Sequence, residues 1–145
     1  MCIDGGVVAL SGNPVGGTFS GTGVVGNNFD PTVSGAGTFV ITYTYTDANG
    51  CTNSDNTSVT VNPLPVVTIT PIATMCIDGG VVALSGTPVG GTFSGTGVVG
   101  NNFDPSVSGA GTFVITYTYT DVNGCTNSDN TSVTVNPLPI VTITP

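Results

Sequence analysis

Six amino acids never occur in this chain of 145 residues: Glu, Gln, Lys, Arg, His and Trp. Without His, Lys or Arg the chain has no imidazole base, no amine for a Schiff base and no guanidinium group for a phosphate. Most acid–base and phosphoryl-transfer enzymes are therefore excluded. The eight acidic residues are all aspartates, and the net charge is −8. We expect no binding to nucleic acid or to anionic membrane surfaces, which would repel this charge.

Long apolar segments are also missing. Runs such as Val7-Val8-Ala9-Leu10 are far shorter than the roughly 20 residues that span a bilayer. No basic segment follows Met1, so the sequence shows no signal peptide, and any export signal lies outside it. The hydrophobic fraction of 39% nevertheless argues against disorder, and we expect the chain to fold.

The sequence consists of two near-identical copies. Residues 1–71 align with residues 75–145 at a shift of 74, with 67 identities in 71 positions. The four differences are Asn13/Thr87, Thr32/Ser106, Ala48/Val122 and Val66/Ile140. This pattern predicts tandem copies of one module, each large enough for a small core. We call residues 1–71 the first repeat and residues 75–145 the second repeat.

The composition favours strands. Gly, Thr and Val make up 69 residues and are poor helix formers, and no apolar stripe of helical period runs for ten residues, so we expect no helix. Apolar and polar residues alternate over 39–46, and the turn at Asn49-Gly50 predicts a hairpin with a strand over 57–61. The inward face of the first strand holds Phe39, Ile41, Tyr43 and Tyr45. Further strands are predicted at 7–11, 17–20, before Pro31 and at 66–70.

Six or seven short strands in every 74 residues indicate an all-β protein, built of tandem immunoglobulin-like β-sandwich modules. The boundary is placed at Asn62-Pro63-Leu64-Pro65, because these prolines cannot donate ladder hydrogen bonds. The predicted modules are 1–62, with its first strand missing or supplied from elsewhere, 63–136, and 137–145 as the first strand of a following repeat. In an alternative frame, residues 65–71 close the module that they follow.

Four motifs recur in both copies: GGTFSG at 16–21, FDP at 29–31, GTFVITYTYTDANGCT at 37–52 and VNPLP at 61–65. With them the chain resembles the immunoglobulin-like or PKD-like repeats of giant secreted surface adhesins of gliding bacteria. The resemblance implies cargo of type IX secretion, an extracellular location at the cell surface, and a place in an adhesin stalk or filament. It implies no ligand. Phe39 stands where a tyrosine corner would place its hydroxyl, which departs from the immunoglobulin pattern.

The function that we predict is structural and non-catalytic: a repeat of an adhesin stalk or surface filament. The expected partners are neighbouring repeats of the same protein, joined head to tail by strand addition through residues 139–144. The alternative is an adhesion module that binds carbohydrate or protein, with or without calcium. Solvent exposure of Tyr43 and Tyr45 in a row would favour that alternative.

No cofactor is predicted, and calcium is a weak candidate because it needs only oxygen ligands. The candidate residues are Asp4, Asp78, Asp47 and Asp121. Asp47 opens a segment that starts like an EF-hand loop, but Cys51 takes its fifth position and Ser58 its twelfth, where a glutamate is expected. The competing interpretation is that these aspartates cap backbone N–H groups in turns.

Each repeat contains two cysteines, and their spacings match no zinc motif: Cys2, Cys51, Cys76 and Cys125. In an exported protein they should be oxidised. One connectivity joins Cys2 to Cys51 and Cys76 to Cys125. In a seven-stranded sandwich, however, these partners lie a strand length apart, roughly 25–30 Å, whereas a disulfide spans at most about 7 Å between Cα atoms. We therefore favour Cys2–Cys125, with Cys51 and Cys76 left for neighbouring modules.

Overall fold

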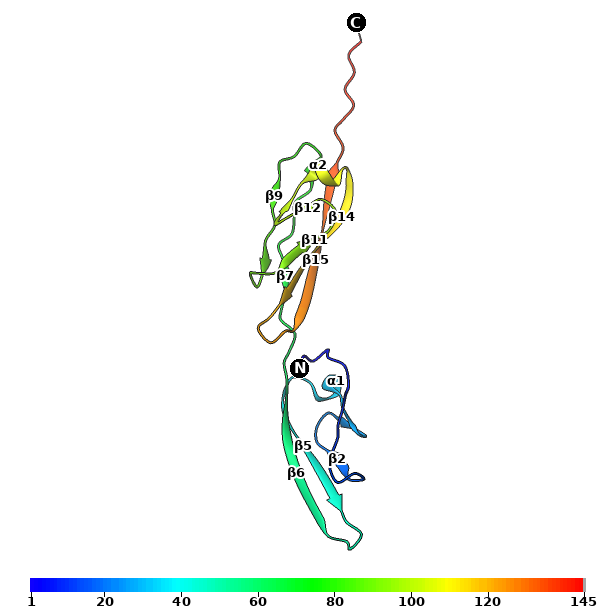
Figure 1. The fold of residues 1–145 in the computed structure, drawn as a ribbon. Helices are drawn as coiled ribbons and strands as arrows, with labels where there is room; N and C mark the ends of the chain where they lie inside the picture. The colour runs from blue at the N-terminus through cyan, green and yellow to red at the C-terminus, as the bar shows by residue number, and fades with distance from the viewer. Residues whose placement is uncertain (145) are drawn as a thin grey trace. The chain divides into compact units, whose positions relative to one another are not determined.

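The computed structural model describes residues 1–144 and is an all-β structure with two one-turn helices (Figure 1). The chain divides into two compact units. Unit 1 contains Met1–Leu64 together with Val122–Cys125, and unit 2 contains Pro65–Asp121 together with residues 126–144. The all-β class expected from composition is confirmed.

Unit 1 is built from two three-stranded antiparallel sheets. Their orders are β1-β4-β3 and β2-β5-β6. The elements are β1 (Val8–Ala9), β2 (Thr18–Ser20), β3 (Val24–Val25), β4 (Asn28–Phe29), α1 (Pro31–Ser34), β5 (Gly37–Thr46) and β6 (Thr52–Val61).

Unit 2 repeats this plan and adds further pairings. Its sheets have the orders β12-β13-β9, β11-β14-β15-β8 and β10-β7, with β8 parallel to β15. The elements are β7 (Thr68–Ile69), β8 (Met75–Cys76), β9 (Val82–Ala83), β10 (Gly86–Thr87), β11 (Thr92–Ser94), β12 (Val98–Val99), β13 (Asn102–Phe103), α2 (Pro105–Ser108), β14 (Gly111–Thr120) and β15 (Thr126–Asn136).

The β5/β6 hairpin is the longest pairing of unit 1, and it confirms the predicted hairpin. Its register places Phe39 opposite Val59 and Ile41 opposite Thr57. Ile41 and Val61 are buried with Phe29 in the core of the unit, as the alternation predicted. The second strand starts at Thr52, five residues earlier than expected, because ladder hydrogen bonds to β5 hold a polar segment whose side chains have little strand propensity.

The prediction that the chain has no helix is wrong at α1 and α2. Asp30 is the N-cap of α1: its carboxylate accepts from the backbone N–H of Thr32 at 2.9 Å, and Pro31 takes the first helical position. Asp104 and Pro105 do the same for α2. A four-residue helix has no room for an apolar stripe, so only the Asp-Pro pair could have signalled it.

Residues 66–70 belong structurally to unit 2, because β7 pairs there with β10. No strand is assigned over 137–144, and Pro145 lies outside the described residues, so the assignment of 137–145 as the first strand of a following repeat stays a prediction. A strand needs a neighbour to complete its ladder, and no described segment supplies one to these residues. Figure 1 shows them leaving β15 as a single extended segment.

Candidate functional site

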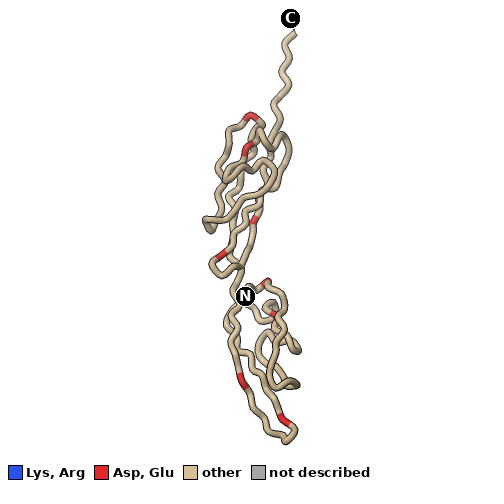
Figure 2. The backbone as a smooth tube through the Cα atoms, in the orientation of Figure 1, with Lys and Arg blue, Asp and Glu red and all other residues tan. Residues whose placement is uncertain are grey.

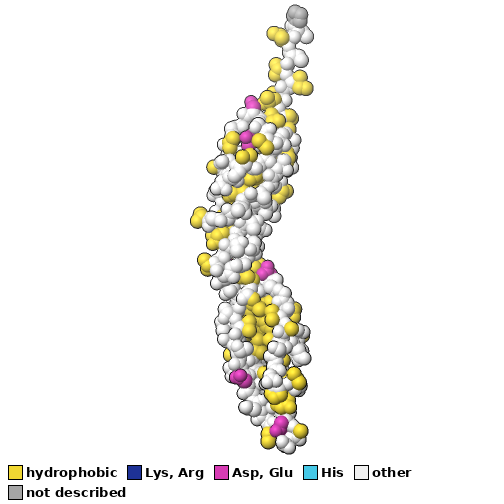
Figure 3. Space-filling view, viewed as in Figure 1, with side chains coloured by type: hydrophobic (Ala, Val, Ile, Leu, Met, Phe, Trp, Pro, Cys, Tyr) yellow, Lys and Arg dark blue, Asp and Glu magenta, His cyan; other side chains and the backbone are white. Residues whose placement is uncertain are grey.

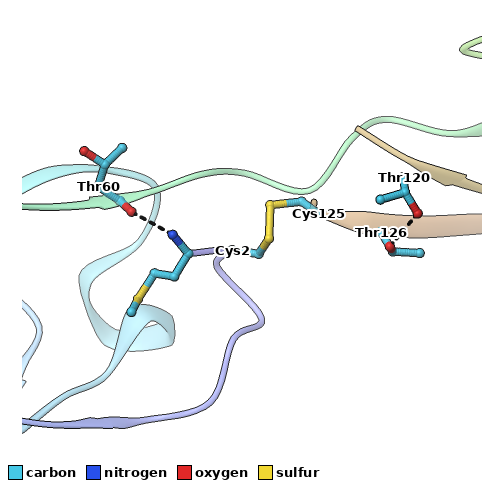
Figure 4. Close-up of a disulfide and its surroundings, with 6 residues drawn as sticks. Cys2, Thr60, Thr120, Cys125 and Thr126 are labelled. Carbon is cyan, nitrogen blue, oxygen red and sulfur yellow. Dashed lines mark hydrogen bonds between the residues drawn. A yellow bond between two sulfur atoms is a disulfide. The ribbon is translucent and has the colours of Figure 1, made fainter. Parts of the chain in front are cut away.

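A disulfide joins Cys2 to Cys125, with 5.5 Å between the Cα atoms and a sequence separation of 123 (Figure 4). Cys2 is held by a parallel bridge to Asn62. On the other side, the hydroxyls of Thr120 and Thr126 hydrogen-bond at 2.7 Å across the end of the β14/β15 hairpin, next to Cys125. The structure thus contains the pairing that the sequence analysis favoured over Cys2–Cys51.

Cys51 and Cys76 are free, exposed thiols. At the repeat spacing of 74, Cys51 corresponds to Cys125 and Cys76 corresponds to Cys2. Each free cysteine is therefore the copy of a residue that is disulfide-bonded elsewhere in the same chain. The sequence analysis left this pair for neighbouring modules, and that assignment stays a prediction.

One of the aspartates proposed for calcium, Asp47, holds a turn. Asp47 Oδ1 accepts from the backbone N–H groups of Cys51 at 2.9 Å and Asn49 at 2.8 Å. The hydrogen bond from the Cys51 N–H is the largest cause that holds the pKa of the Asp47 carboxyl below its ordinary value. Burial, the next cause, opposes it, and weaker hydrogen bonds from Asn49 lower the pKa further. Asp4 and Asp78 lie exposed on the surface, and Asp121 is half-buried. Among residues 1–144, no three Cys or Asp side chains gather in a group that could hold a metal ion.

The helix caps show the same chemistry. The Thr32 hydroxyl donates to Asp30 Oδ1 at 2.6 Å, and this bond, with the one from the Thr32 backbone, lowers the pKa of Asp30. Ser106 repeats both bonds with Asp104. Both aspartates are half-buried, and their carboxylates are engaged with local backbone, which is a structural role. Figure 2 shows the aspartates dispersed over both units, with no Lys or Arg beside them.

The tyrosines do not form an exposed row. Tyr43 and Tyr45 are both half-buried, and Tyr117, the copy of Tyr43, is only 2% exposed. The Tyr43 hydroxyl donates to the Pro14 carbonyl at 2.6 Å and accepts from the Gly17 N–H at 2.8 Å. This hydroxyl bridges β5 to the loop before β2, a link that was not predicted. The aromatic platform required by the carbohydrate-binding alternative is therefore not observed at these positions.

Unit 1 carries a groove of about 300 Å³ that sequence reasoning missed. It runs between the segment after β1 and the middle of β6, with aromatic and aliphatic side chains of β2 and β5 at its base. The lining residues are Leu10, Ser11, Gly12, Asn13, Phe19, Ile41, Tyr43, Asp55, Asn56 and Thr57. On the face of unit 1 drawn in Figure 3, hydrophobic side chains gather in an exposed patch. This groove is the candidate binding site of the chain.

Within residues 1–144, no helix has the length and apolar character needed to cross a membrane.

Comparisons with known proteins show no family. No family model matches the chain, and no curated protein matches it. One matching solved structure is described as a Ca2+-stabilized adhesin that helps an Antarctic bacterium reach out and bind ice. The match has 20% identity and a TM-score of 0.39, and covers 85% of this chain and 41% of that one. The chain thus spans less than half of that neighbour, and a similarity at this level carries no argument about function.

Proposed function

We propose that this chain is a non-catalytic structural segment of an extracellular stalk or surface filament, in which an immunoglobulin-like β-sandwich recurs every 74 residues. The observation that carries the proposal is the disulfide Cys2–Cys125, which covalently joins the first repeat to the second. Such a bond is typical of oxidising, extracellular compartments. Near-identical repeats suit a spacer, because one stable solution is repeated along its length.

The available side chains support a structural role. The sequence has no His, Lys, Arg or Glu, and the Asp30, Asp47 and Asp104 carboxylates are occupied in capping local backbone. The resemblance to adhesin repeats of gliding bacteria extends the proposal: type IX secretion would export the chain, and the cell surface would be its location. Calcium remains part of the proposal only as an ion bound by the surface aspartates.

Mechanical stretching tests this function. If the full chain is held by its two ends, the load passes through Cys2–Cys125 and bypasses the chain between them, which spans a sequence separation of 123. At roughly 3.3–3.6 Å per extended residue, adding a reductant under load should lengthen the chain by about 400 Å. The control is Cys125→Ser, which should reach the longer extension without reductant. Equal extension of both proteins in the absence of reductant would contradict a load-bearing role.

A binding screen tests the alternative. Glycan arrays and cell-adhesion assays with the full chain, with and without calcium, should give no specific signal. Specific retention on one glycan class would overturn the purely structural version of the proposal.

A further inference from the structure

A five-residue segment occurs in both repeats with a single difference and has two different environments. Residues 66–70 read VVTIT, and residues 140–144 read IVTIT. In unit 2, Val67 and Ile69 are 8% and 7% exposed, whereas their copies Val141 and Ile143 are 86% and 95% exposed. Two exposed β-branched residues at alternate positions are the features of a strand that has no partner.

The buried copy shows how this sequence is held. Ile69 lies opposite Gly86 in the β7/β10 ladder, and the N–H of Thr70 donates to the Ser85 carbonyl at 2.9 Å. On its other side, the N–H of Ile69 donates to Asp129 Oδ2 at 3.1 Å. Val67 and Ile69 pack in the core of unit 2. The strand thus fits between the segment before β11 and the middle of β15.

The groove of unit 1 lies at the position that corresponds, by the repeat of 74, to the site of β7 in unit 2. Its two walls are residues 10–13 and 55–57, which precede by 74 the residues 84–87 and 129–131 that surround β7. Burial differs accordingly: Leu84 and Tyr117 are buried, whereas their copies Leu10 and Tyr43 are half-buried. Asp129 is half-buried under β7, and its copy Asp55 is exposed.

The polar groups that would hydrogen-bond an added strand are also present in the groove. Asp55 Oδ1 accepts from the Asn56 N–H at 2.8 Å, as Asp129 Oδ1 accepts from Asn130 at 2.9 Å. Asp55 Oδ2 is therefore the copy of the oxygen that accepts from Ile69 in unit 2. Gly12 lies against the Tyr43 ring, where a Cβ atom would come within 2.5 Å of ring carbons, and Gly86 lies against Tyr117 in the same way. The backbone that faces an incoming strand is thus close to the ring in both units.

We propose that the groove of unit 1 binds residues 140–144 of a second copy of this chain as an added antiparallel β-strand. Val141 and Ile143 enter the groove, and Ile143 lies opposite Gly12. The N–H of Ile143 donates to Asp55, and that of Thr144 donates to the Ser11 carbonyl. Main-chain hydrogen bonds supply affinity and the two inward side chains supply specificity, which is the physics of β-strand addition.

The disulfide pairing follows the same order of repeats as the strand pairing. Residues 66–70, at the end of the first repeat, pair with the second repeat through β10, and Cys2 of the first repeat is bonded to Cys125 of the second. The same relation between two copies pairs Cys76 of the chain that donates the strand with Cys51 of the chain that accepts it. Both thiols are exposed.

Oxidised glutathione can close this bond by exchange. The Cys76 thiolate attacks a sulfur of oxidised glutathione and releases one glutathione thiolate. The Cys51 thiolate then attacks the Cys76 sulfur of the mixed disulfide and releases a second. Two protein thiols become one disulfide, one oxidised glutathione becomes two reduced molecules, and the two thiol protons pass to them.

The inference extends the proposed function, because strand donation from copy to copy would build a head-to-tail filament. A segment that bears load through Cys2–Cys125 does not require this donation. The stretching experiment above tests that bond alone, so a failure of strand donation leaves its result unchanged.

Sedimentation of the full chain tests the non-covalent step. All proteins carry Cys51→Ser and Cys76→Ser, which leaves Cys2–Cys125 intact. The parent should associate increasingly with concentration, and Ile143→Asp should weaken association at least tenfold by placing a charge in the apolar groove. Ile140→Asp is the matched control: it is equally exposed in the free chain, but its copy Val66 is 83% exposed beside β7, so its association should stay within about twofold of the parent.

A peptide of residues 139–145 provides a second measurement. Added to the Ile143→Asp protein, it should shift the amide resonances of Gly12, Asn13 and Asp55, whereas the same peptide with Asp at position 143 should not. The proposal is overturned if the parent stays monomeric and the peptide shifts none of these resonances. Equal association of Ile143→Asp and Ile140→Asp also overturns it.

Peptide mapping of the wild-type chain tests the covalent step. After treatment with oxidised glutathione, cleavage without reductant should yield a Cys51–Cys76 link in covalent dimers and longer species, and Ile143→Asp should lose it. A Cys51–Cys76 link confined to monomers would show that the segment folds back on its own chain, and would overturn the second copy as occupant.

Discussion

Replacing Ile69 and Ile143 separately by alanine measures how much burial of one strand contributes to unit 2. The two residues occupy the same repeat position, but the exposed fractions of their side chains are 7% and 95%. Ile69 packs in a core with Leu84, Tyr117 and Val133. Removing a buried isoleucine down to alanine costs about 2–5 kcal/mol, since transfer energy is lost and a cavity remains. At Ile143 the change should stay within about 0.5 kcal/mol, because an exposed side chain loses no contacts on truncation.

Hydrogen exchange of the backbone amides of β14 and β15 is the appropriate assay, because it reports the stability of unit 2 separately from unit 1. The experiment uses the Cys51→Ser, Cys76→Ser background at a concentration where the chain is monomeric. A loss of 3 kcal/mol corresponds to about a 150-fold faster exchange of the most protected amides. If Ile69→Ala and Ile143→Ala changed exchange equally, the assignment of β7 to the core of unit 2 would be refuted.

Three further predictions use the same molecule. Tyr117→Phe should destabilise unit 2 by about 1–3 kcal/mol in hydrogen exchange, because it leaves the partly buried N–H and carbonyl partners of this buried tyrosine's hydroxyl unpaired. Tyr43→Phe should cost unit 1 less, because water reaches that half-buried side chain. The pKa values of Asp30 and Asp104 are lowered by the hydroxyl two residues on, so the stability from these caps is complete above the ordinary pKa of aspartate and is lost as pH falls through the lowered folded value. Acid unfolding followed by circular dichroism should therefore begin below about pH 4. The loss of stability with falling pH should be less steep when Asp30 and Asp104 are both replaced by Asn. Trypsin should leave the chain intact by mass spectrometry even in denaturant, since there is no Lys or Arg; any fragment would contradict this.

The hairpins were the part of the fold most accessible to sequence reasoning. Strict alternation from Phe39 to Tyr45 and the turn at Asn49-Gly50 are local signals, and β5 and β6 form there. The two-residue strands β1, β3 and β4 were less clear, because two residues are too few to show an alternation of apolar and polar side chains. The helices α1 and α2 depend on a single capping aspartate and a proline, which a search for periodicity does not detect.

Of the candidate site, too, only one part could be predicted from the sequence. The cysteines are conspicuous in any reading, and strand length against disulfide reach was enough to favour Cys2–Cys125. The groove was not predicted, because its walls come from residues 10–13 and 55–57, which only tertiary structure brings together. The internal repeat held the necessary signal: a sequence that forms a strand in one copy needs an equivalent place in the other.

The four differences between the repeats show which positions of the fold tolerate substitution. Val122 is almost fully exposed, and Val66 and Ile140 both point to solvent, so neither difference changes a packed contact. Thr32 and Ser106 each supply a hydroxyl that donates at 2.6 Å to the aspartate that caps the helix. Asn13 stands where Thr87 hydrogen-bonds β7 through its hydroxyl, and an amide can serve the same partner. The two copies therefore have the same capacity to fold and to hold a strand, and the different burial of Ile69 and Ile143 reflects only whether a groove lies next to that strand.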